Sequence, residues 1–213
     1  MIPKIKNIAV FASGSGSNFI AIYNQVKRGD INGRIKLLIT NNSNAKAIRF
    51  AENNNIDYNV INKETILDSS AYKSYLMKIL CEAKVDLIVL AGYLKIIPSD
   101  VIHAYKNKII NIHPSLLPKF GGKGFYGMKV HKAVIDSKEI YTGASVHFVD
   151  EIYDNGPIIM QEKIEVKPSD SPESISKKVL KIEHKILPYV VKKFCLGQIV
   201  FEENLPVIKG DFE

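Results

Sequence analysis

The chain has 213 residues, of which 46% are hydrophobic and 24% are charged, and this balance excludes a disordered or fibrous protein. Its formal net charge is +7, but the basic residues are scattered, and no run of five like charges forms a nucleic-acid-binding arm. We read the charge as a solvated surface that can also steer anionic substrates.

The sequence carries no pattern that directs it to a membrane or to an oxidising compartment. No apolar run reaches transmembrane length, and the apolar stretch near the N-terminus is too short for a signal peptide. Cys81 and Cys195 form no metal or redox motif, so reduced thiols are expected. We therefore expect a cytoplasmic protein with no metal, no membrane partner and no nucleic-acid partner. The sequence does not decide between a monomer and a homodimer.

The first half of the chain alternates apolar strand patterns with helical ones. The strand patterns cover residues 7–12, 35–40, 58–61, 86–91 and 108–112. The helical patterns cover residues 18–28, 45–54 and 71–83. Continuous apolar strands separated by helices are typical of a parallel sheet that is covered on both faces. The sequence therefore predicts an α/β fold with a doubly wound, mostly parallel, Rossmann-like sheet.

The second half has longer strands and a glycine-rich loop. Residues 116–127 hold four glycines, and we expect them to form a loop before a helix over residues 128–137. Strands over residues 142–149 and 157–166 flank a turn, which predicts an antiparallel strand pair in this half. A proline within residues 169–173 marks the start of a long final helix.

A glycine-rich turn, residues 12–18, follows the first predicted strand and opens a helix. Glycine lets the backbone turn tightly and approach a ligand, and free N–H groups at a helix start attract an anion. Phe19 stands where a dinucleotide motif would have its third glycine, so a mononucleotide phosphate fits better than a pyrophosphate. A plain tight turn, with Ser17 or Asn18 capping the helix, is the alternative interpretation.

A second motif, residues 111–118, follows a predicted central strand, and ligands bind outside the carboxyl ends of such strands. Asn111 and His113 are two positions apart in an extended segment, so their side chains point the same way. An amide and an imidazole aimed at one point can hold a carbonyl and then its oxyanion. Asp154 lies in the D-N-G-P turn between the two long strands, which by itself is ordinary turn chemistry.

Taken together and in this order, the motifs resemble the glycinamide ribonucleotide formyltransferase family. The matching strings are GSGSN at 14–18, LAGY at 90–93, NIHPSLLPKF at 111–120, SVHFVDE at 145–151, DNGP at 154–157 and IEH at 182–184. The resemblance covers nearly the whole chain. It implies an enzyme that transfers the formyl group of 10-formyltetrahydrofolate, its co-substrate, to the amine of glycinamide ribonucleotide in purine synthesis.

The resemblance also implies a single domain over residues 1–213 and a role for each matching position. The half up to about residue 105 would bind the nucleotide phosphate, and the rest would bind the folate and carry the catalytic groups. The catalytic positions are Asn111, His113 and Asp154. The ribonucleotide-binding positions are Gly16, Ser17, Asn18 and Glu183. The folate-binding positions are Leu94, Lys95, Ile96, Ile97, Asn111, Asp150, Glu151, Ile152, Tyr153 and Asp154.

Two positions depart from the family pattern. Lys95 stands where the family commonly has arginine, and Ser69 stands where it commonly has a basic residue. Contacts with the substrates at these two positions would therefore differ from those of the relatives. His147, inside an apolar strand, is expected to be a hydrogen-bonded core histidine rather than a catalyst.

The implied reaction needs no enzyme nucleophile, because the substrate amine attacks the formyl carbon directly. Asn111 would donate a hydrogen bond to the oxyanion, and Asp154 would keep His113 protonated, since a nearby carboxylate favours imidazolium. Two other functions stay open. The first is another member of the superfamily, a formyltetrahydrofolate hydrolase or a methionyl-tRNA formyltransferase. The second is a non-catalytic nucleotide-binding module with the same sheet.

Overall fold

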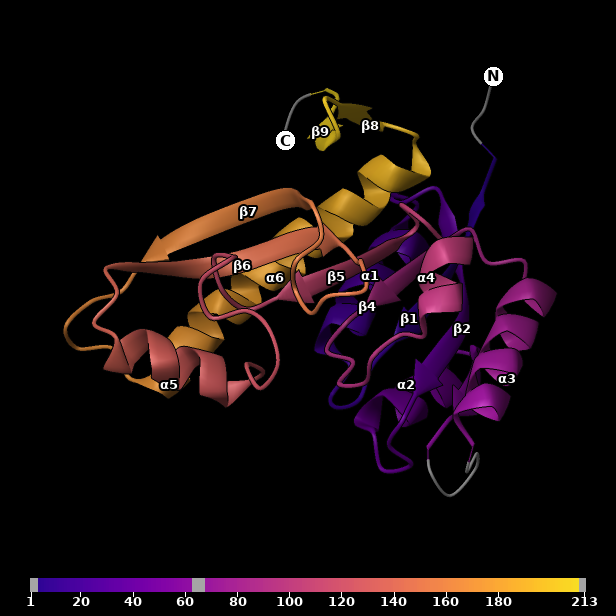
Figure 1. Ribbon diagram of the computed structural model, residues 1–213, viewed down its shortest axis with the longest axis horizontal. Coiled ribbons are helices and arrows are strands. Elements are labelled where there is room, and N and C mark those ends of the chain that lie inside the picture. Colours follow the sequence, from indigo (N-terminus) through magenta and orange to yellow (C-terminus); the bar gives the residue numbers. More distant parts are fainter. Residues whose placement is uncertain (1–3, 63–67, 211–213) are drawn as a thin grey trace. The chain divides into compact units, whose positions relative to one another are not determined.

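Figure 1 shows the computed structural model, which describes residues 4–62 and 68–210. The chain forms two compact units, Met1–Ile110 and Asn111–Glu213. Among the described residues, seven strands form one sheet in the order β3-β2-β1-β4-β5-β6-β7, and β8 and β9 form a separate pair. The expected α/β fold with a mostly parallel sheet is confirmed. The expected single domain stays a prediction.

The bounds of the elements follow the predicted ones closely. The strands are β1 (Lys6–Phe11), β2 (Gly33–Thr40), β3 (Asp57–Val60), β4 (Leu87–Leu90), β5 (Ile109–His113), β6 (Tyr141–Phe148), β7 (Ile158–Glu165), β8 (Ile199–Glu202) and β9 (Leu205–Ile208). The helices are α1 (Ser17–Arg28), α2 (Lys46–Asn53), α3 (Ser69–Glu82), α4 (Ser99–Ala104), α5 (Met128–Asp136) and α6 (Pro172–Cys195). Each predicted strand and helix has a counterpart here, whereas α4, β8 and β9 were not predicted.

The unit Met1–Ile110 is built around β1, which pairs in parallel with β2 and with β4. The side chains of residues 8–11 in β1 and 87–89 in β4 are fully buried, which is why these strands read as uninterrupted apolar runs. The helix α1 contacts α2, and α3 contacts α4. The parallel strands bring the loops at their carboxyl ends, residues 12–16 and 91–98, to the same edge of the sheet.

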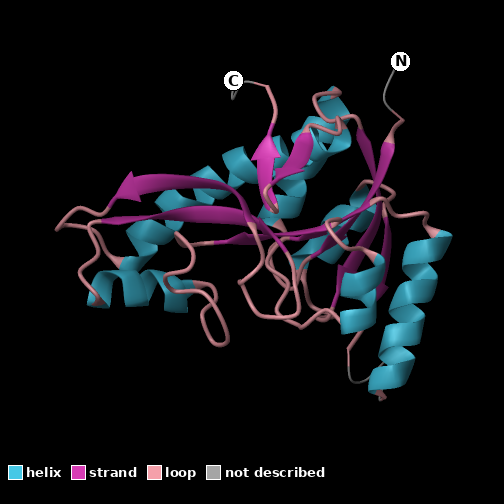
Figure 2. Cartoon of the chain, turned by 45° about the horizontal axis from the view of Figure 1, so that its top comes forward, coloured by secondary structure: helices cyan, strands magenta, loops and turns pink. Residues whose placement is uncertain are grey.

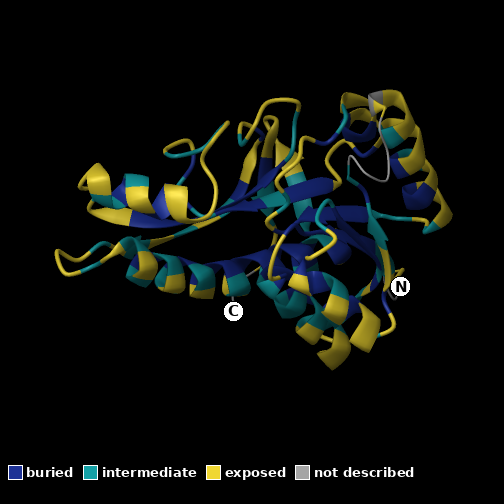
Figure 3. Cartoon of the chain, turned by 90° about the horizontal axis from the view of Figure 1, so that it is seen from below, coloured by how far each residue is buried: buried dark blue, intermediate teal, exposed yellow. Residues whose placement is uncertain are grey.

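The unit Asn111–Glu213 contains the antiparallel pair β6 and β7, which Figure 2 shows as two long strands. Residues 142–148 of β6 are all buried, whereas β7 alternates between exposed and less exposed positions. The helix α6 packs on both strands and on α5. Figure 3 shows the resulting contrast between dark blue strands and yellow outer helix surfaces. The buried β6 is therefore the central strand of this unit's hydrophobic core.

The helix α6 begins at a proline, as the sequence predicts. The Ser171 side chain accepts from the Ser174 N–H, and the Ser174 hydroxyl accepts from the Ser171 N–H, so the two form a capping box. Such a cap satisfies N–H groups that the first helical turn leaves without partners. No described helix, α6 included, has both the length and the apolar character needed to cross a bilayer.

The turn between β6 and β7 is crowded at Gly156. A Cβ added there would lie 1.9 Å from the carbonyl oxygen of Phe148, whose own N–H donates to Pro157 O at 2.9 Å. We expect Gly156→Ala to lower the free energy of unfolding by about 1–3 kcal/mol, the usual cost of overpacking, in a denaturant titration. Gly14→Ala is the control, because a Cβ at Gly14 meets no atom within 4 Å. Equal losses in both variants would contradict the steric explanation.

Candidate active site

Three of the side chains selected from the sequence lie together in the unit Asn111–Glu213. The Asn111 Nδ2 group donates to Asp154 Oδ1 at 3.2 Å, and His113 Nδ1 lies 3.4 Å from Asp154 Oδ2. The His113 side chain is 5% exposed and that of Asp154 is 11% exposed, so water screens their interaction weakly. The structure thus brings Asn111 and His113, from β5, to a carboxylate in the turn that precedes β7.

His147 of β6 joins this cluster through the amide of Asn111. Its Nε2 lies 3.0 Å from Asn111 Nδ2, and its Nδ1 lies 2.7 Å from the carbonyl oxygen of Phe148. A carbonyl oxygen can only accept, so Nδ1 carries the proton and Nε2 accepts from the amide. Both Asn111 amide protons are therefore engaged, one by His147 and one by Asp154. The expectation of a buried, hydrogen-bonded histidine is confirmed, but its contact with Asn111 was not predicted.

The ring of His113 is held on both sides. Its Nε2 lies 2.7 Å from the carbonyl oxygen of Phe120, so Nε2 carries a proton and donates it. Burial lowers the pKa of His113, and the charge of Asp154 and the carbonyl of Phe120 offset this effect only in part. The expectation that Asp154 keeps His113 protonated is therefore wrong for the protein alone. At neutral pH the ring is neutral, and its Nδ1 lone pair faces the carboxylate.

Asp154 is the most heavily bonded member of the cluster. Burial would raise its pKa, but the nearby His147 and His113 rings and the N–H of Gly122 outweigh burial and lower the pKa below its usual value. The Gly122 N–H donates to Asp154 Oδ2 at 2.9 Å. Asp154 also has a left-handed backbone, with φ of 52°, a conformation that aspartate tolerates better than most residues. The carboxylate is thus ionised and fixed in place.

The loop around Asp154 contains four more positions expected to bind folate. The Asp150 carboxylate accepts from the N–H of Ile152 at 2.9 Å and from the Asn155 amide at 2.8 Å, so it shapes the turn. Ile152 and Tyr153 are 65% and 43% exposed, and Glu151 is exposed as well. The turn therefore presents apolar side chains to the surface beside the Asp154 carboxylate.

The glycine-rich turn lies in the unit Met1–Ile110. Gly16 has a left-handed backbone, with φ of 73°, and a Cβ there would lie 2.8 Å from the Cβ of Ala47. Ser17 is the first residue of α1, which has no acidic residue in its first turn, and Asn18 is buried. A helix start with a compact glycine turn and no acidic residue suits an anion.

Ser13 ties this turn to the loop expected to bind folate within the same unit. Its hydroxyl accepts from the N–H of Leu94 at 3.0 Å and donates to Asn41 Oδ1 at 2.5 Å. Leu94 and Ile96 are 52% and 57% exposed, whereas Ile97 is 3% exposed. The Ile97 side chain thus belongs to the core, and Leu94 and Ile96 are the apolar side chains of this loop that a ligand can reach.

The remaining positions that the sequence singled out are Lys95, Glu183 and Ser69. Lys95 is exposed, and Glu183 is 9% exposed on α6, where it makes a polar interaction within the chain. Ser69 is the first residue of α3, but its side chain lies outside the described part of the chain. Among the described residues, no group of three or more His, Cys, Asp or Glu side chains is placed to hold a metal ion.

Sequence reasoning missed three groups of the cluster: His147, the carbonyl of Phe120 and the N–H of Gly122. A signal for His147 was available, because a buried polar side chain in an apolar strand needs a hydrogen-bonding partner. No comparable signal marks the two backbone groups, because any residue could supply them. Their role comes from the path of the loop, residues 114–127, and not from their side chains.

Comparisons with known proteins agree on one family. The family model described as formyl transferase matches residues 6–191. The chloroplastic phosphoribosylglycinamide formyltransferase of Arabidopsis thaliana is 43% identical over 210 residues, which are 98% of this chain and 72% of that protein. The Bacillus subtilis phosphoribosylglycinamide formyltransferase is 39% identical over 189 residues, 89% of this chain and 94% of that protein. The crystal structure of glycinamide ribonucleotide transformylase 1 from Symbiobacterium toebii has a TM-score of 0.88 and 31% identity, with 96% of this chain and 94% of that chain covered.

A pH effect on stability follows from His131 of α5, which is 3% exposed and whose Nδ1 has no hydrogen-bond partner among the described residues. Burial, with a smaller effect of His113, lowers its pKa to about 4. The unfolded chain therefore binds this proton first, so stability is lost as the pH falls from about 6.5 towards 4. We expect His131→Gln to flatten this loss in denaturant titrations across that range, and His103→Gln, an exposed control, to leave it unchanged. An unaltered loss in His131→Gln would show that other groups cause it.

Proposed function

Because the chain belongs to the formyl transferase family, and to its phosphoribosylglycinamide formyltransferases, we propose that it transfers a formyl group from 10-formyltetrahydrofolate to the amine of glycinamide ribonucleotide, a step of purine biosynthesis. The single observation that carries this proposal is the part-buried contact of Asn111 and His113 with the Asp154 carboxylate. A nucleotide-binding module without catalysis has no need for a buried, ionised carboxylate held by an amide and an imidazole.

The proposed reaction is a direct acyl transfer. The substrate's amine nitrogen bonds to the formyl carbon, and the carbonyl electrons move to the formyl oxygen, which becomes an oxyanion. When the oxyanion collapses, the bond from the formyl carbon to the folate nitrogen breaks. The amine loses a proton, and the folate nitrogen gains one. The protein therefore has two tasks, which are to stabilise the oxyanion and to move a proton between two nitrogens.

Asn111 is the group suited to the oxyanion. Its amide protons are directed at His147 and at Asp154 in the protein alone. A formyl oxygen that accepts one of them would compete with these acceptors. A neutral carbonyl competes weakly, whereas an oxyanion competes strongly, because bonds to charged acceptors are about twice as strong. The exchange thus favours the transition state over the ground state, which is the requirement for catalysis.

His113 and Asp154 are the groups suited to the proton. The neutral His113 ring has its unprotonated Nδ1 3.4 Å from the carboxylate, so a proton that arrives there becomes stabilised by Asp154. The amine proton can therefore pass to this pair and later to the folate nitrogen. The lowered pKa of Asp154 keeps its charge available at neutral pH. In this view the imidazolium forms during the reaction and is not present at its start.

The two substrates are assigned to separate groups of residues. Gly16, Ser17 and Asn18 would hold the ribonucleotide phosphate, and Glu183 would bind the ribose hydroxyls. Each unit has exposed apolar side chains of the kind that suits the flat, partly apolar ring system of a folate, Leu94 and Ile96 in one and Ile152 and Tyr153 in the other. A cytoplasmic location and a monomeric or homodimeric state stay predictions.

The catalytic assignment is tested by changing one group at a time. We expect His113→Ala and Asp154→Asn each to lower kcat by at least about 100-fold, because each removes one preorganised group. His103→Ala and Asp136→Asn, which change exposed residues, serve as controls and should keep normal turnover. Near-normal kcat in either catalytic variant, with folding verified by circular dichroism, would overturn the role given to that residue.

Introducing a negative charge at Ser17 tests whether the glycine-rich turn binds the ribonucleotide phosphate. We expect Ser17→Asp to raise KM for the ribonucleotide at least about tenfold, because a carboxylate at the start of α1 repels a phosphate there. The same carboxylate suits the helix dipole, so folding should not suffer. Ser17→Asn, of nearly equal size but uncharged, is the matched control. An unchanged KM in Ser17→Asp would mean that the phosphate lies elsewhere, and an equal rise in both variants would attribute the effect to size and not to charge.

One assay separates this function from its alternatives. Deformylation of 10-formyltetrahydrofolate is followed with the purified protein in the presence and absence of glycinamide ribonucleotide. We expect turnover only when the ribonucleotide is present. Turnover without it would indicate a formyltetrahydrofolate hydrolase, and no turnover in either case would favour the binding module or another formyl acceptor.

A further inference from the structure

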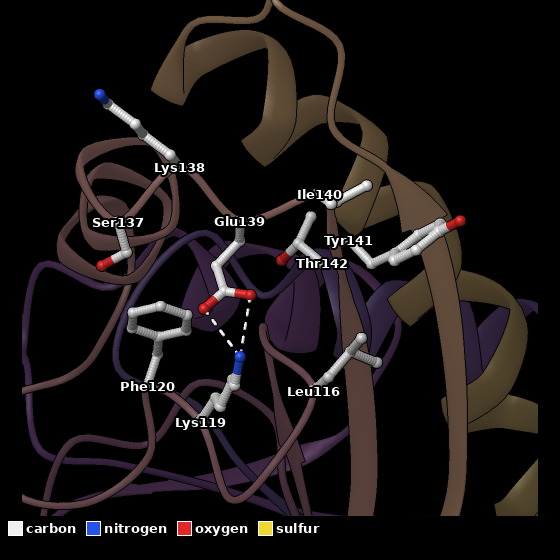
Figure 4. A pocket seen from close by; sticks show the side chains of 9 residues that line it. All are labelled: Leu116, Lys119, Phe120, Ser137, Lys138, Glu139, Ile140, Tyr141 and Thr142. Carbon is white, nitrogen blue, oxygen red and sulfur yellow. Dashed lines mark hydrogen bonds and ion pairs between the residues drawn. The ribbon is translucent and has the colours of Figure 1, made fainter.

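A cavity lies in the unit Asn111–Glu213. Its volume is about 470 Å³, and it lies between the loop that follows β5 and the connection from α5 to β6. Figure 4 shows the Phe120 ring on one side of the Lys119–Glu139 pair, and Leu116 on the other side. None of the three proposed catalytic residues lines it. Its volume falls within the range of small-molecule sites, about 300–1,000 Å³.

Thr142 supplies a polar group at this cavity with no partner in the protein. The residue is 2% exposed, and its Oγ1 has no hydrogen bond among the described residues. In Figure 4 this oxygen points towards the side chain of Glu139. A buried hydroxyl without a partner costs about 1–3 kcal/mol, so an occupant that bonds to it would gain from this contact.

Charged groups surround the same space. The Lys119 Nζ atom contacts both carboxylate oxygens of Glu139, at 2.9 and 3.0 Å. The Lys119 side chain is 67% exposed, whereas that of Glu139 is only 23% exposed, and Lys138 is exposed beside them. Of the sheltered groups, the Glu139 carboxylate accepts hydrogen bonds, and the Thr142 hydroxyl can accept or donate one. The exposed groups, Lys119 and Lys138, are cations, and together with the Glu139 carboxylate they carry a net charge of +1.

We propose that this cavity binds a nucleoside monophosphate. The planar base would lie against the Phe120 ring, and its N–H groups would donate to Glu139 and Thr142. Those bonds would release Lys119 from Glu139, so that Lys119 and Lys138 could contact the phosphate. Base stacking on an aromatic ring and phosphate binding by lysines are well suited to such a ligand.

The cavity is connected to the catalytic cluster through one residue. The Phe120 ring lines the cavity, and the Phe120 carbonyl accepts from His113 Nε2 at 2.7 Å. A base stacked on the ring therefore biases the position of the carbonyl that fixes the tautomer of His113. The bound nucleotide lowers formyl transfer by this route, and this effect, unlike binding itself, rests on the proposed function.

Adenosine monophosphate is the probe, and isothermal titration calorimetry with the full chain measures its binding. We expect Thr142→Val to weaken binding about tenfold, the value of one hydrogen bond. The same variant should raise the melting temperature without ligand, because it removes an unpartnered hydroxyl. Glu165→Gln, at an exposed position outside the cavity, should leave binding unchanged. Adenosine and inorganic phosphate should each bind more weakly than the whole nucleotide.

A ribonucleotide probe can also occupy the substrate site, and Ser17→Asp distinguishes the two places. Binding that survives Ser17→Asp and weakens in Thr142→Val supports the proposal. Binding that is lost in Ser17→Asp and unchanged in Thr142→Val overturns it, as does the absence of binding to the wild-type chain. If binding depends on Thr142 but the wild-type chain shows no formyl transfer activity, the nucleotide site is supported and the proposed function is rejected.

Discussion

The cluster of Asn111, His113, His147 and Asp154 depends on one largely sheltered carboxylate. Asp154 accepts hydrogen bonds from the Asn111 amide and the Gly122 N–H and lies 3.4 Å from His113 Nδ1. Removing the carboxylate would leave two donors, the Asn111 amide and the Gly122 N–H, without their common partner, which is costly in a sheltered site. The same carboxylate orders the loop through Gly122 and presents a negative charge to the imidazole. The Asp154 carboxylate therefore both holds the loop in place and serves the proton transfer that we propose for His113.

The chain's second half combines that rigid centre with exposed apolar side chains. β6 is buried along nearly its whole length, and it positions His147 behind Asn111. Ile152 and Tyr153 remain exposed in the turn that carries Asp154. A family of formyl transferases needs this combination, because the reacting groups must be fixed while a large, flat co-substrate enters and leaves.

The sequence predicted the fold wherever burial was continuous. Residues 8–11 of β1 and all of β4 are apolar and buried because both faces of the sheet are covered there, and such runs have few other interpretations. α4 has only six residues, too few for a helical period to show. β8 and β9 have one buried residue between them, so no buried apolar run marks them, unlike the equally short β4. The charge of His113 was predicted incorrectly, because the sequence displays its carboxylate neighbour but not the desolvation that outweighs it. The contact between His147 and Asn111 spans 36 positions and depends on strand placement that no local pattern encodes.

The hydroxyl of Ser13 accepts from the N–H of Leu94 and donates to Asn41, so the loop at Leu94 and the glycine-rich turn share one anchor. A ligand that orders either segment also restricts the other through this anchor. The first ligand to bind would then bear most of the conformational entropy cost of ordering both segments. If the two proposed substrates bind at these two segments, the second would meet a stiffer protein and bind more tightly, so their affinities would be coupled.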